Sequence, residues 1–385
     1  MVGERHLLYK LLSQFVAFSF MISFAAYGAE EKAAWQIEWE KTVAAAKKEG
    51  QVNIYMWGPT NEEAVLNAAG FPKAFPEIKI FGVPGMSGQV ERRILAERRA
   101  GRFLADLVIT GANSNYNTLY RAKVLDPVKT ALILPEVVDE SKWWGGKHRY
   151  VDPEGRYIFV ALGTANSGGF SYNTNLVKNP KEFSSYWDFL RPKWKGKITM
   201  QDVRGNPGRA RASLTFFYHH PEVGPDFIRR LVAEMDVALF KDERLGTDWL
   251  ATGRFPICFA CDARPAKQQG LPVDDFGPMK EGQGLSPQGG TLTLVNKAPH
   301  PNAARVFINW FLSREGQTIY QSAGVAKPGE SSSNSLREDV PKDVVIPDRR
   351  RLKGVSYLPL DRWDVLDMDP IYKVINEGLS RAERR

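Results

Sequence analysis

Cysteine is nearly absent from this chain of 385 residues, which has two cysteines, both in the stretch RFPICFACDAR. No cysteine precedes Cys258, so the N-terminal region offers no thiol for attachment of a lipid. FPICFA is typical of a buried strand, on which residues three apart point to opposite faces. We therefore expect two buried thiols, with a Cys258–Cys261 disulfide only if the strand ends at Phe259. A redox or zinc role would need a helix start or a second ligand pair, and the sequence has neither.

Long apolar segments are also missing. The most apolar stretch, LLSQFVAFSFMISFAA, is interrupted by polar residues and falls short of the roughly 20 apolar residues that span a bilayer. Arg5 and Lys10 precede it and small residues follow it, which is the order of a secretory signal. We predict a signal peptide over residues 1–28, cleaved after Gly28, and a protein exported to the periplasm.

Catalytic motifs are lacking as well. The sequence has no G-x-S-x-G, no H-E-x-x-H and no Walker loop. Histidines are few, and the adjacent pair His219 and His220 precedes Pro221, which is typical of an exposed helix end. We expect no enzyme, no bound metal and no cofactor, and a secreted hydrolase is the alternative of a different class.

The composition is that of an ordinary globular protein. Hydrophobic residues make up 43% and charged residues 25%, and the formal charge is +8 from 52 basic and 44 acidic residues. Such an excess favours acidic partners weakly and does not require nucleic acid. The length exceeds what one core usually serves and predicts two lobes.

Strands alternate with helices along most of the chain. The patterns predict strands in QVNIYMW, EIKIFGV, ADLVITG, KITMQD, PICFACD and QGGTLTLVNKA, separated by amphipathic helices. Such alternation is typical of α/β layers with parallel strands. We predict a first lobe from residues 29–168 and 273–385 and an inserted second lobe from residues 169–272, with two crossing strands between them as a hinge.

The stretch SYWDFLRPKWKGKITMQD is the most distinctive motif. It resembles the Trp-Asp helix, Pro-Lys-Trp-Lys-Gly bend and strand of periplasmic solute-binding proteins of ABC importers, the subfamily that includes ferric-ion binders. AKKEGQVNIYMW, RILAERRAGRFLADLVITG, GFSYNTNLV and HPNAARVFINWFLSREGQ resemble further segments of the family in the same order. The resemblance covers roughly residues 35 to 325. It implies the two-lobed type II periplasmic-binding-protein fold, closure on a small ligand and delivery to a membrane permease.

Iron is the main alternative ligand that the resemblance raises. Ferric binders of this family usually present adjacent tyrosines in the second lobe, and this sequence contains no Tyr-Tyr pair. The approximate place for such a pair reads CFACDARP. This departure puts iron in doubt, although Tyr116, Tyr172 or Asp262 could ligate a metal together with an anion.

In α/β layers, ligands lie outside the carboxyl ends of the strands. The loops there predict a ligand site with hydroxyl, glycine and arginine donors suited to an anion. We expect the ligand-binding residues to be Thr60, Ser87, Gly88, Thr110, Arg204, Arg209, Asp262 and Arg264. Each also has a plain structural explanation, as a helix cap, a turn or a solvated charge.

The sequence thus predicts a monomeric substrate-binding component of an ABC transporter. It should capture a small anionic solute, such as a carboxylate, phosphonate or phosphate ester, and deliver it to an inner-membrane permease. We expect no nucleic-acid partner.

Overall fold

The computed structural model describes residues 32–57, 70–166, 169–204, 210–323, 325–327 and 330–383. The predicted signal peptide lies outside these residues. The chain divides into two compact units, Met1–Lys41 and Thr42–Arg385, and the sheets of the described residues all lie in the second unit. Among the described residues, no helix is both long and apolar enough to cross a bilayer.

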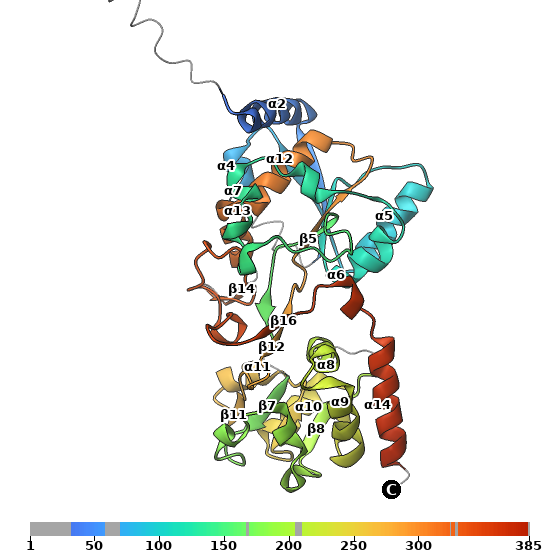
Figure 1. The fold of residues 1–385 in the computed structure, drawn as a ribbon, viewed down its shortest axis with the longest axis vertical. Helices are drawn as coiled ribbons and strands as arrows, with labels where there is room; N and C mark the ends of the chain where they lie inside the picture. The colour runs from blue at the N-terminus through green and yellow to red at the C-terminus, as the bar shows by residue number, and fades with distance from the viewer. Residues whose placement is uncertain are drawn as a thin grey trace, which may run out of the picture. The chain divides into compact units, whose positions relative to one another are not determined.

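The first sheet combines segments from the two halves of the sequence (Figure 1). Its strand order is β2-β1-β3-β13-β4, with β5 paired to β13; β1 is parallel to β2 and β3, whereas β13 is antiparallel to β3. Continuous apolar runs such as LVIT in β3 form strands buried on both faces. The bounds are β1 Gln51–Trp57, β2 Lys79–Gly85, β3 Leu107–Thr110, β4 Leu125–Asp126, β5 Ile158–Val160 and β13 Thr291–Val295.

The second sheet has the order β11-β7-β10-β8-β9. β8, β9 and β10 are parallel, and β7 runs antiparallel to both β10 and β11. Its apolar core is rich in phenylalanine, with Phe170 and Phe189 stacked at a ring-centroid distance of 3.8 Å. The bounds are β7 Phe170–Asn173, β8 Ile198–Gln201, β9 Ala238–Phe240, β10 Ile257–Phe259 and β11 Val273–Asp275.

A third, small sheet lies where the chain passes between the two larger ones. β6 Thr164–Ala165 leads from the first sheet to the second, and β12 Gln283–Ser286 leads back. These are the two crossing strands that the sequence predicts. β16 Tyr357–Pro359 pairs in parallel with β12 as a third crossing segment. The sequence patterns do not predict this third strand. The connection therefore consists of three hydrogen-bonded strands.

The C-terminal part of the chain does not stay with the first sheet. β11 pairs with β7 of the second sheet, and α14 Asp369–Ala382 packs its apolar face against α9 Gly224–Glu234 (Figure 1). Gly378 lies so close to Val232 that a Cβ atom there would be 2.2 Å from the valine side chain. The division at residue 273 remains a prediction, while the pairing and packing associate β11 and α14 with the second sheet.

The distinctive SYWDFLRPKWKGKITMQD stretch folds as expected, as helical turns, a bend and a strand. η6 Tyr186–Leu190 and η7 Pro192–Trp194 are 3₁₀ turns that lead into β8. Trp194 is buried against Phe183, whereas Lys193 and its neighbouring lysines are exposed. The tryptophans therefore serve packing, and the lysines form a solvated face.

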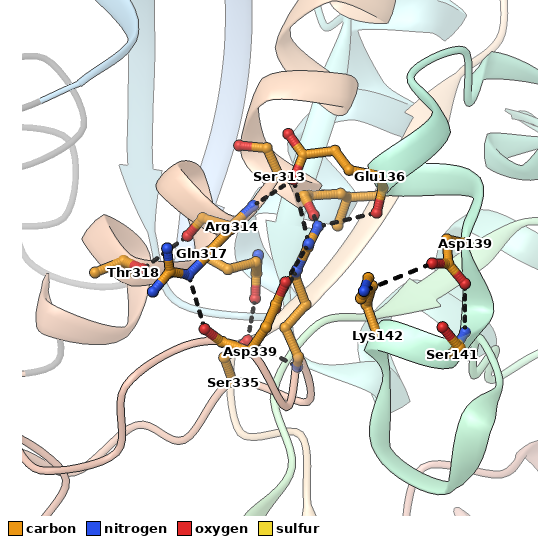
Figure 2. Close-up of polar contacts among 12 residues, drawn as sticks. Glu136, Asp139, Ser141, Lys142, Ser313, Arg314, Gln317, Thr318, Ser335 and Asp339 are labelled. Atoms are coloured by element: carbon orange, nitrogen blue, oxygen red, sulfur yellow. Dashed lines mark hydrogen bonds and ion pairs between the residues drawn. The ribbon is translucent and has the colours of Figure 1, made fainter.

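A polar network anchors the segment after α13 Arg314–Ala323 to the first-sheet layer (Figure 2). The buried Arg337 guanidinium donates to both carboxylate oxygens of Asp339, at 2.9 and 2.8 Å, and to the Leu312 carbonyl at 2.8 Å. The Ser335 hydroxyl donates to Gln317 of α13 at 2.7 Å. These bonds fix the path of the chain that continues to η8 Pro347–Arg349.

The other helices cover the sheets or connect strands. Their bounds are α4 Phe71–Ala74, α5 Gln89–Arg99, α6 Ala112–Ser114, α7 Pro135–Val138, α8 Ala210–His219, α10 Glu243–Ala251, α11 Ala263–Gln268, α12 Pro301–Leu312 and α13 Arg314–Ala323. The shorter turns are η1 Asn115–Tyr120, η2 Val128–Ala131, η3 Glu140–Lys142, η4 Trp144–Gly146, η5 Pro180–Glu182 and η9 Trp363–Val365, and β14 Val325–Lys327 pairs with β15 Glu330–Ser331.

Candidate functional site

A small cavity of about 170 Å³ lies beside the crossing strands, at the carboxyl end of β10. Its walls come from the second sheet, from α8 and α11, from β12 and from η8. The lining residues are Asn166, Gly169, Ala212, Ala260, Cys261, Asp262, Ala263, Arg264, Asp275, Ser286 and Arg349. Two residues predicted from the sequence, Asp262 and Arg264, are among them.

The loop after β10 brings these two residues to the cavity. β10 ends at Phe259, and Ala260 has a φ of 68°, a left-handed conformation that turns the chain sharply. The Ala260 N–H donates to the Gly169 carbonyl at 2.7 Å. Because the strand ends here, Cys258 and Cys261 are joined in a disulfide, so the expectation of two separate thiols was wrong.

Arg264 and Arg349 are the cations of the cavity. The Arg264 Nη2 atom lies 2.6 Å from Asp348 Oδ2, and the Arg349 Nε atom lies 3.8 Å from the same oxygen. Two guanidinium groups thus lie at one carboxylate, and the Arg349 Nη1 group also donates to the Ala165 carbonyl at 3.5 Å. Asp262 contributes an acidic group to the same lining.

Asp275 forms another part of the wall. Its Oδ1 atom accepts a hydrogen bond from the Ser171 hydroxyl at 2.5 Å. Burial raises the pKa of the Asp275 carboxyl, and the bond from Ser171 opposes that shift. A raised pKa widens the pH range over which this carboxyl is protonated and adds no negative charge to the cavity lining.

Two predicted residues of the first sheet, Gly88 and Thr110, bond to Glu91, and neither lines this cavity. The fully buried Glu91 carboxylate accepts from the Thr110 hydroxyl at 2.5 Å, from the Ser114 hydroxyl at 2.7 Å and from the Gly88 N–H at 2.5 Å. Gly88 has a φ of 86°, which favours glycine. The Ser87 hydroxyl is exposed and accepts from the Gly111 N–H at 3.2 Å. This cluster explains the residue types by local hydrogen bonding.

The predicted arginines after β8 are bonded within the protein where the structure describes them. Arg204 holds Asp202 through two bonds of 2.8 Å, and its hydrogen bonds keep the pKa of the Asp202 carboxyl below its usual range. Arg211 of α8, which follows them in the sequence, donates to the Leu366 carbonyl at 2.8 Å. Thr60 and Arg209 lie outside the described residues.

Sequence reasoning missed several residues of the cavity. Asp348 and Arg349 lie in the stretch PDRRR, which mixes acidic and basic residues. Asn166 and Ser286 lie next to or within the crossing strands, and the Asn166 amide donates to the Ser213 hydroxyl at 3.0 Å. The charges in PDRRR were a usable signal, but nothing local connects them with Arg264.

Among the residues that the structure describes, neither tyrosine nor histidine lines the cavity. Over the described part of the chain, no group of three or more histidine, cysteine, aspartate or glutamate residues is placed to hold a metal ion. Burial lowers the pKa of His219, and the His220 ring accepts from the Glu222 N–H at 3.2 Å, as suits residues at the end of a helix. A resident metal centre is therefore not supported by the described side chains.

Comparison with known proteins identifies the family. The family described as bacterial extracellular solute-binding protein matches residues 104–353, which is more than half of the chain. The chain belongs to this family. The solute-binding resemblance seen in the sequence is therefore confirmed. No curated protein matches the chain.

Solved structures support the fold class. An iron- and citrate-bound IdiA (FutA) from Trichodesmium is 19% identical with a TM-score of 0.59, over 87% of this chain and 99% of that chain. Apo FutA2 from Synechocystis PCC6803 is 15% identical with a TM-score of 0.59, over 86% and 98%. Apo ferric ion-binding protein A from Pasteurella haemolytica is 14% identical with a TM-score of 0.58, over 86% and 98%. The predicted two-lobed α/β fold of periplasmic binding proteins is confirmed.

Proposed function

We propose that this solute-binding protein is the periplasmic component of an ABC importer and captures a small organic anion for delivery to an inner-membrane permease. The observation that carries this proposal is the pair of arginines, Arg264 and Arg349, which share the carboxylate of Asp348 beside the cavity. Arginine offers a planar set of N–H donors that fits a carboxylate in a bidentate manner. A carboxylate ligand in the cavity could accept hydrogen bonds from these groups.

The neighbouring groups suit the same ligand. The Ser286 hydroxyl and the Asn166 amide border the cavity and can donate to anionic oxygens. Both lie at the crossing strands, so a ligand bound there would contact the connection about which closure takes place. Ligand binding would then favour the closed form over the open form, and the permease would recognise the closed form.

Thermal unfolding of the mature chain against a panel of ligands tests the proposal. The panel contains citrate, aliphatic and aromatic carboxylates, phosphonates, phosphate esters, polyamines and ferric citrate. A ligand present at about a hundred times its Kd stabilises the folded form by roughly 2.7 kcal/mol. A rise in Tm with carboxylates alone supports the proposal, and a rise confined to polyamines contradicts it.

Ferric iron is the second candidate, and two observations favour it. The Trichodesmium structure contains iron and citrate, and the Pasteurella protein is named for ferric ion. In this chain Asp262 and Asp275 line the small cavity and carry carboxylate oxygens, the hard donors that iron prefers. Against iron, the described lining residues include no tyrosine, and no group of three or more acidic, histidine or cysteine residues in the described part of the chain is placed to hold a metal ion. Ferric citrate stabilising the chain while citrate alone does not would favour iron over the anion.

The expectation that the protein is not an enzyme remains a prediction. Stoichiometric binding of a carboxylate, recovered unchanged after long incubation, would support it. Turnover of added esters or phosphomonoesters would instead point to the hydrolase alternative.

A further inference from the structure

A second, larger cavity of about 490 Å³ adjoins the small one. It is lined by α11, by the segment around η8 and by the crossing strand β12, and Ala263, Arg264 and Asp275 border both cavities. Ligand sites in proteins commonly offer about 300 to 1,000 Å³. The larger cavity is therefore spacious enough to hold a small solute by itself.

Gln283 of β12 is a buried polar side chain in this lining, and only 4% of its surface is exposed. Its backbone N–H donates to the Ser356 carbonyl at 3.0 Å. Its side-chain amide, however, makes no hydrogen bond with any residue that the structure describes. A buried amide without a hydrogen-bond partner is unfavourable. A solute in the cavity can supply the bonds that the protein does not.

Another buried glutamine shows the opposite arrangement. Gln317 of α13 is fully buried, and its side chain donates to the Phe311 carbonyl at 2.9 Å and accepts from the Ser335 hydroxyl at 2.7 Å. These bonds hold the first-sheet layer together. The Gln283 amide makes no such bonds within the described structure, so it is available to a ligand.

The position of Gln283 connects the larger cavity with the crossing strands. β12 pairs with β6 on one side and with β16 on the other, so hydrogen bonds hold both of its edges. Residues three apart on a strand point to opposite faces. Accordingly, Ser286 borders the small cavity, whereas Gln283 borders the larger one. A solute bonded to Gln283 would contact β12 on the face away from the small cavity.

The charged side chains that line the larger cavity are close to balance. Among the described residues, the basic ones are Arg264, Lys267 and Arg350, and the acidic ones are Asp274, Asp275, Glu330 and Asp348. The Arg264 Nη2 atom lies 2.6 Å from Asp348 Oδ2. The Lys267 Nζ atom lies 2.5 Å from Asp274 Oδ1. Because these two pairs neutralise their own charges, neither requires a counter-charge on a ligand.

The other charged groups of this lining are bonded within the protein or face solvent. Arg350 donates to two backbone carbonyls, at 2.5 and 2.8 Å, and Asp275 accepts from the Ser171 hydroxyl. Glu330 is exposed, where water and salt screen its charge. The larger cavity therefore favours an uncharged ligand over an ion of either sign.

The lining offers many hydrogen-bonding atoms next to apolar surface. A carboxylate has about four acceptor sites and a guanidinium has five N–H groups, so an ion pair leaves several of them unused. A hydroxyl group both donates and accepts, which suits such a mixture. The side chains of Ile346, Pro347 and Leu352 can contact C–H groups of the same molecule. Sugars and polyols combine these two kinds of surface.

We propose that the larger cavity binds an uncharged, hydroxyl-rich solute, a sugar or a polyol, whose hydroxyl groups bond to the Gln283 amide. This inference goes beyond the proposed function, because it assigns a second cavity and a different class of ligand. It does not depend on the binding of an anion in the small cavity.

Calorimetry of the mature chain with glucose, galactose, xylose, maltose, myo-inositol and sorbitol tests the inference, with hexanoate and putrescine as charged comparison ligands. A Kd below about 100 µM for at least one sugar or polyol supports it, and sorbitol distinguishes an open-chain polyol from a ring compound. If hexanoate binds and no sugar or polyol does, this inference is overturned and the anion proposal stands. A sugar or polyol that binds while no carboxylate does supports this inference and contradicts the anion proposal. If only putrescine binds, both fail.

A matched pair of buried glutamines locates the effect. Gln283→Met keeps the length of the side chain and removes the amide, so it should weaken binding of the tightest sugar or polyol at least fivefold. Its Tm should stay the same or rise, because no hydrogen bond of the described structure is lost. Gln317→Met removes two internal bonds, so it should lower the Tm and leave the affinity of the folded protein within twofold. A lowered Tm with unchanged affinity in Gln283→Met would overturn the assignment.

Discussion

The carboxyl ends of the two sheets carry similar residue types but use them differently. After β2 and β3 of the first sheet, Gly88, Thr110 and Ser114 all donate to the buried carboxylate of Glu91. After β10 of the second sheet, Arg264 finds its partner in Asp348, which is 84 residues away in the sequence, and both border cavities. A hydrogen-bond donor whose acceptor lies in a neighbouring segment stabilises the loop that carries it. A charged group that meets a distant segment beside a cavity is a better candidate for ligand binding.

The largest effect should come from the first of these regions. Glu91→Ala removes the common acceptor of three donors, of which Thr110 is buried and Gly88 and Ser114 are half-buried, so we expect a loss of about 3 kcal/mol in the free energy of unfolding. Chemical denaturation measures this loss. Glu91→Gln retains one acceptor oxygen and should lose less. Ligand affinity of the folded fraction should not change, and a tenfold weaker affinity would mean that this cluster belongs to the site.

The disulfide at the second region should have the next largest effect. Replacing both Cys258 and Cys261 by serine removes a covalent loop of four residues. From the loss of chain entropy in the unfolded state, we expect the free energy of unfolding to fall by about 2 kcal/mol. Denaturation of this variant, and of the wild type with and without reductant, measures the change. The double variant should be insensitive to reductant. A wild type that is equally insensitive and yields two free thiols on titration would show that the bond does not form.

Arg264 and Arg204 provide a direct contrast between a cavity arginine and a locally paired one. Arg264→Ala should weaken carboxylate binding at least tenfold, because it removes one of the two guanidinium groups at the cavity. Its ion pair with Asp348 is partly exposed, so stability should fall by no more than about 1 kcal/mol. Arg204→Ala should leave affinity unchanged, since that side chain holds Asp202. Calorimetry with hexanoate distinguishes the two, and the reverse order of effects would favour a site near β8.

The pH dependence of stability should identify Asp275. Because burial raises the pKa of its carboxyl, the folded state binds this proton more tightly than the unfolded state does. The stabilisation is present at acidic pH and is lost as the pH rises from the ordinary carboxyl pKa through the raised value. Asp275→Asn should flatten this part of the curve, and it keeps an acceptor for Ser171. Asp274→Asn is the matched control, and an equal flattening in both variants would contradict the assignment.

Much of the fold could be predicted from local patterns. β1 and β8 were predicted because hydrophobic periodicity is a property of neighbouring residues. The pairing of β11 with β7 and the third crossing strand β16 depend on contacts between distant segments, which no short pattern records. The same limit applies to the site. Arg264 was predicted because it follows a strand, whereas Asp348 and Arg349 were missed because their partner lies far away in the sequence.

The smallest predicted effect concerns Ser87. It tests whether the carboxyl end of the first sheet takes part in ligand binding. Its hydroxyl is exposed and accepts one bond of 3.2 Å from Gly111, so Ser87→Ala should change the free energy of unfolding by less than about 0.5 kcal/mol. Carboxylate affinity should stay within twofold, because Ser87 does not line either cavity. Calorimetry with hexanoate measures this. A tenfold loss of affinity without a loss of stability would show that the loop after β2 reaches the ligand when it binds, and the two sheet ends would then act as one site.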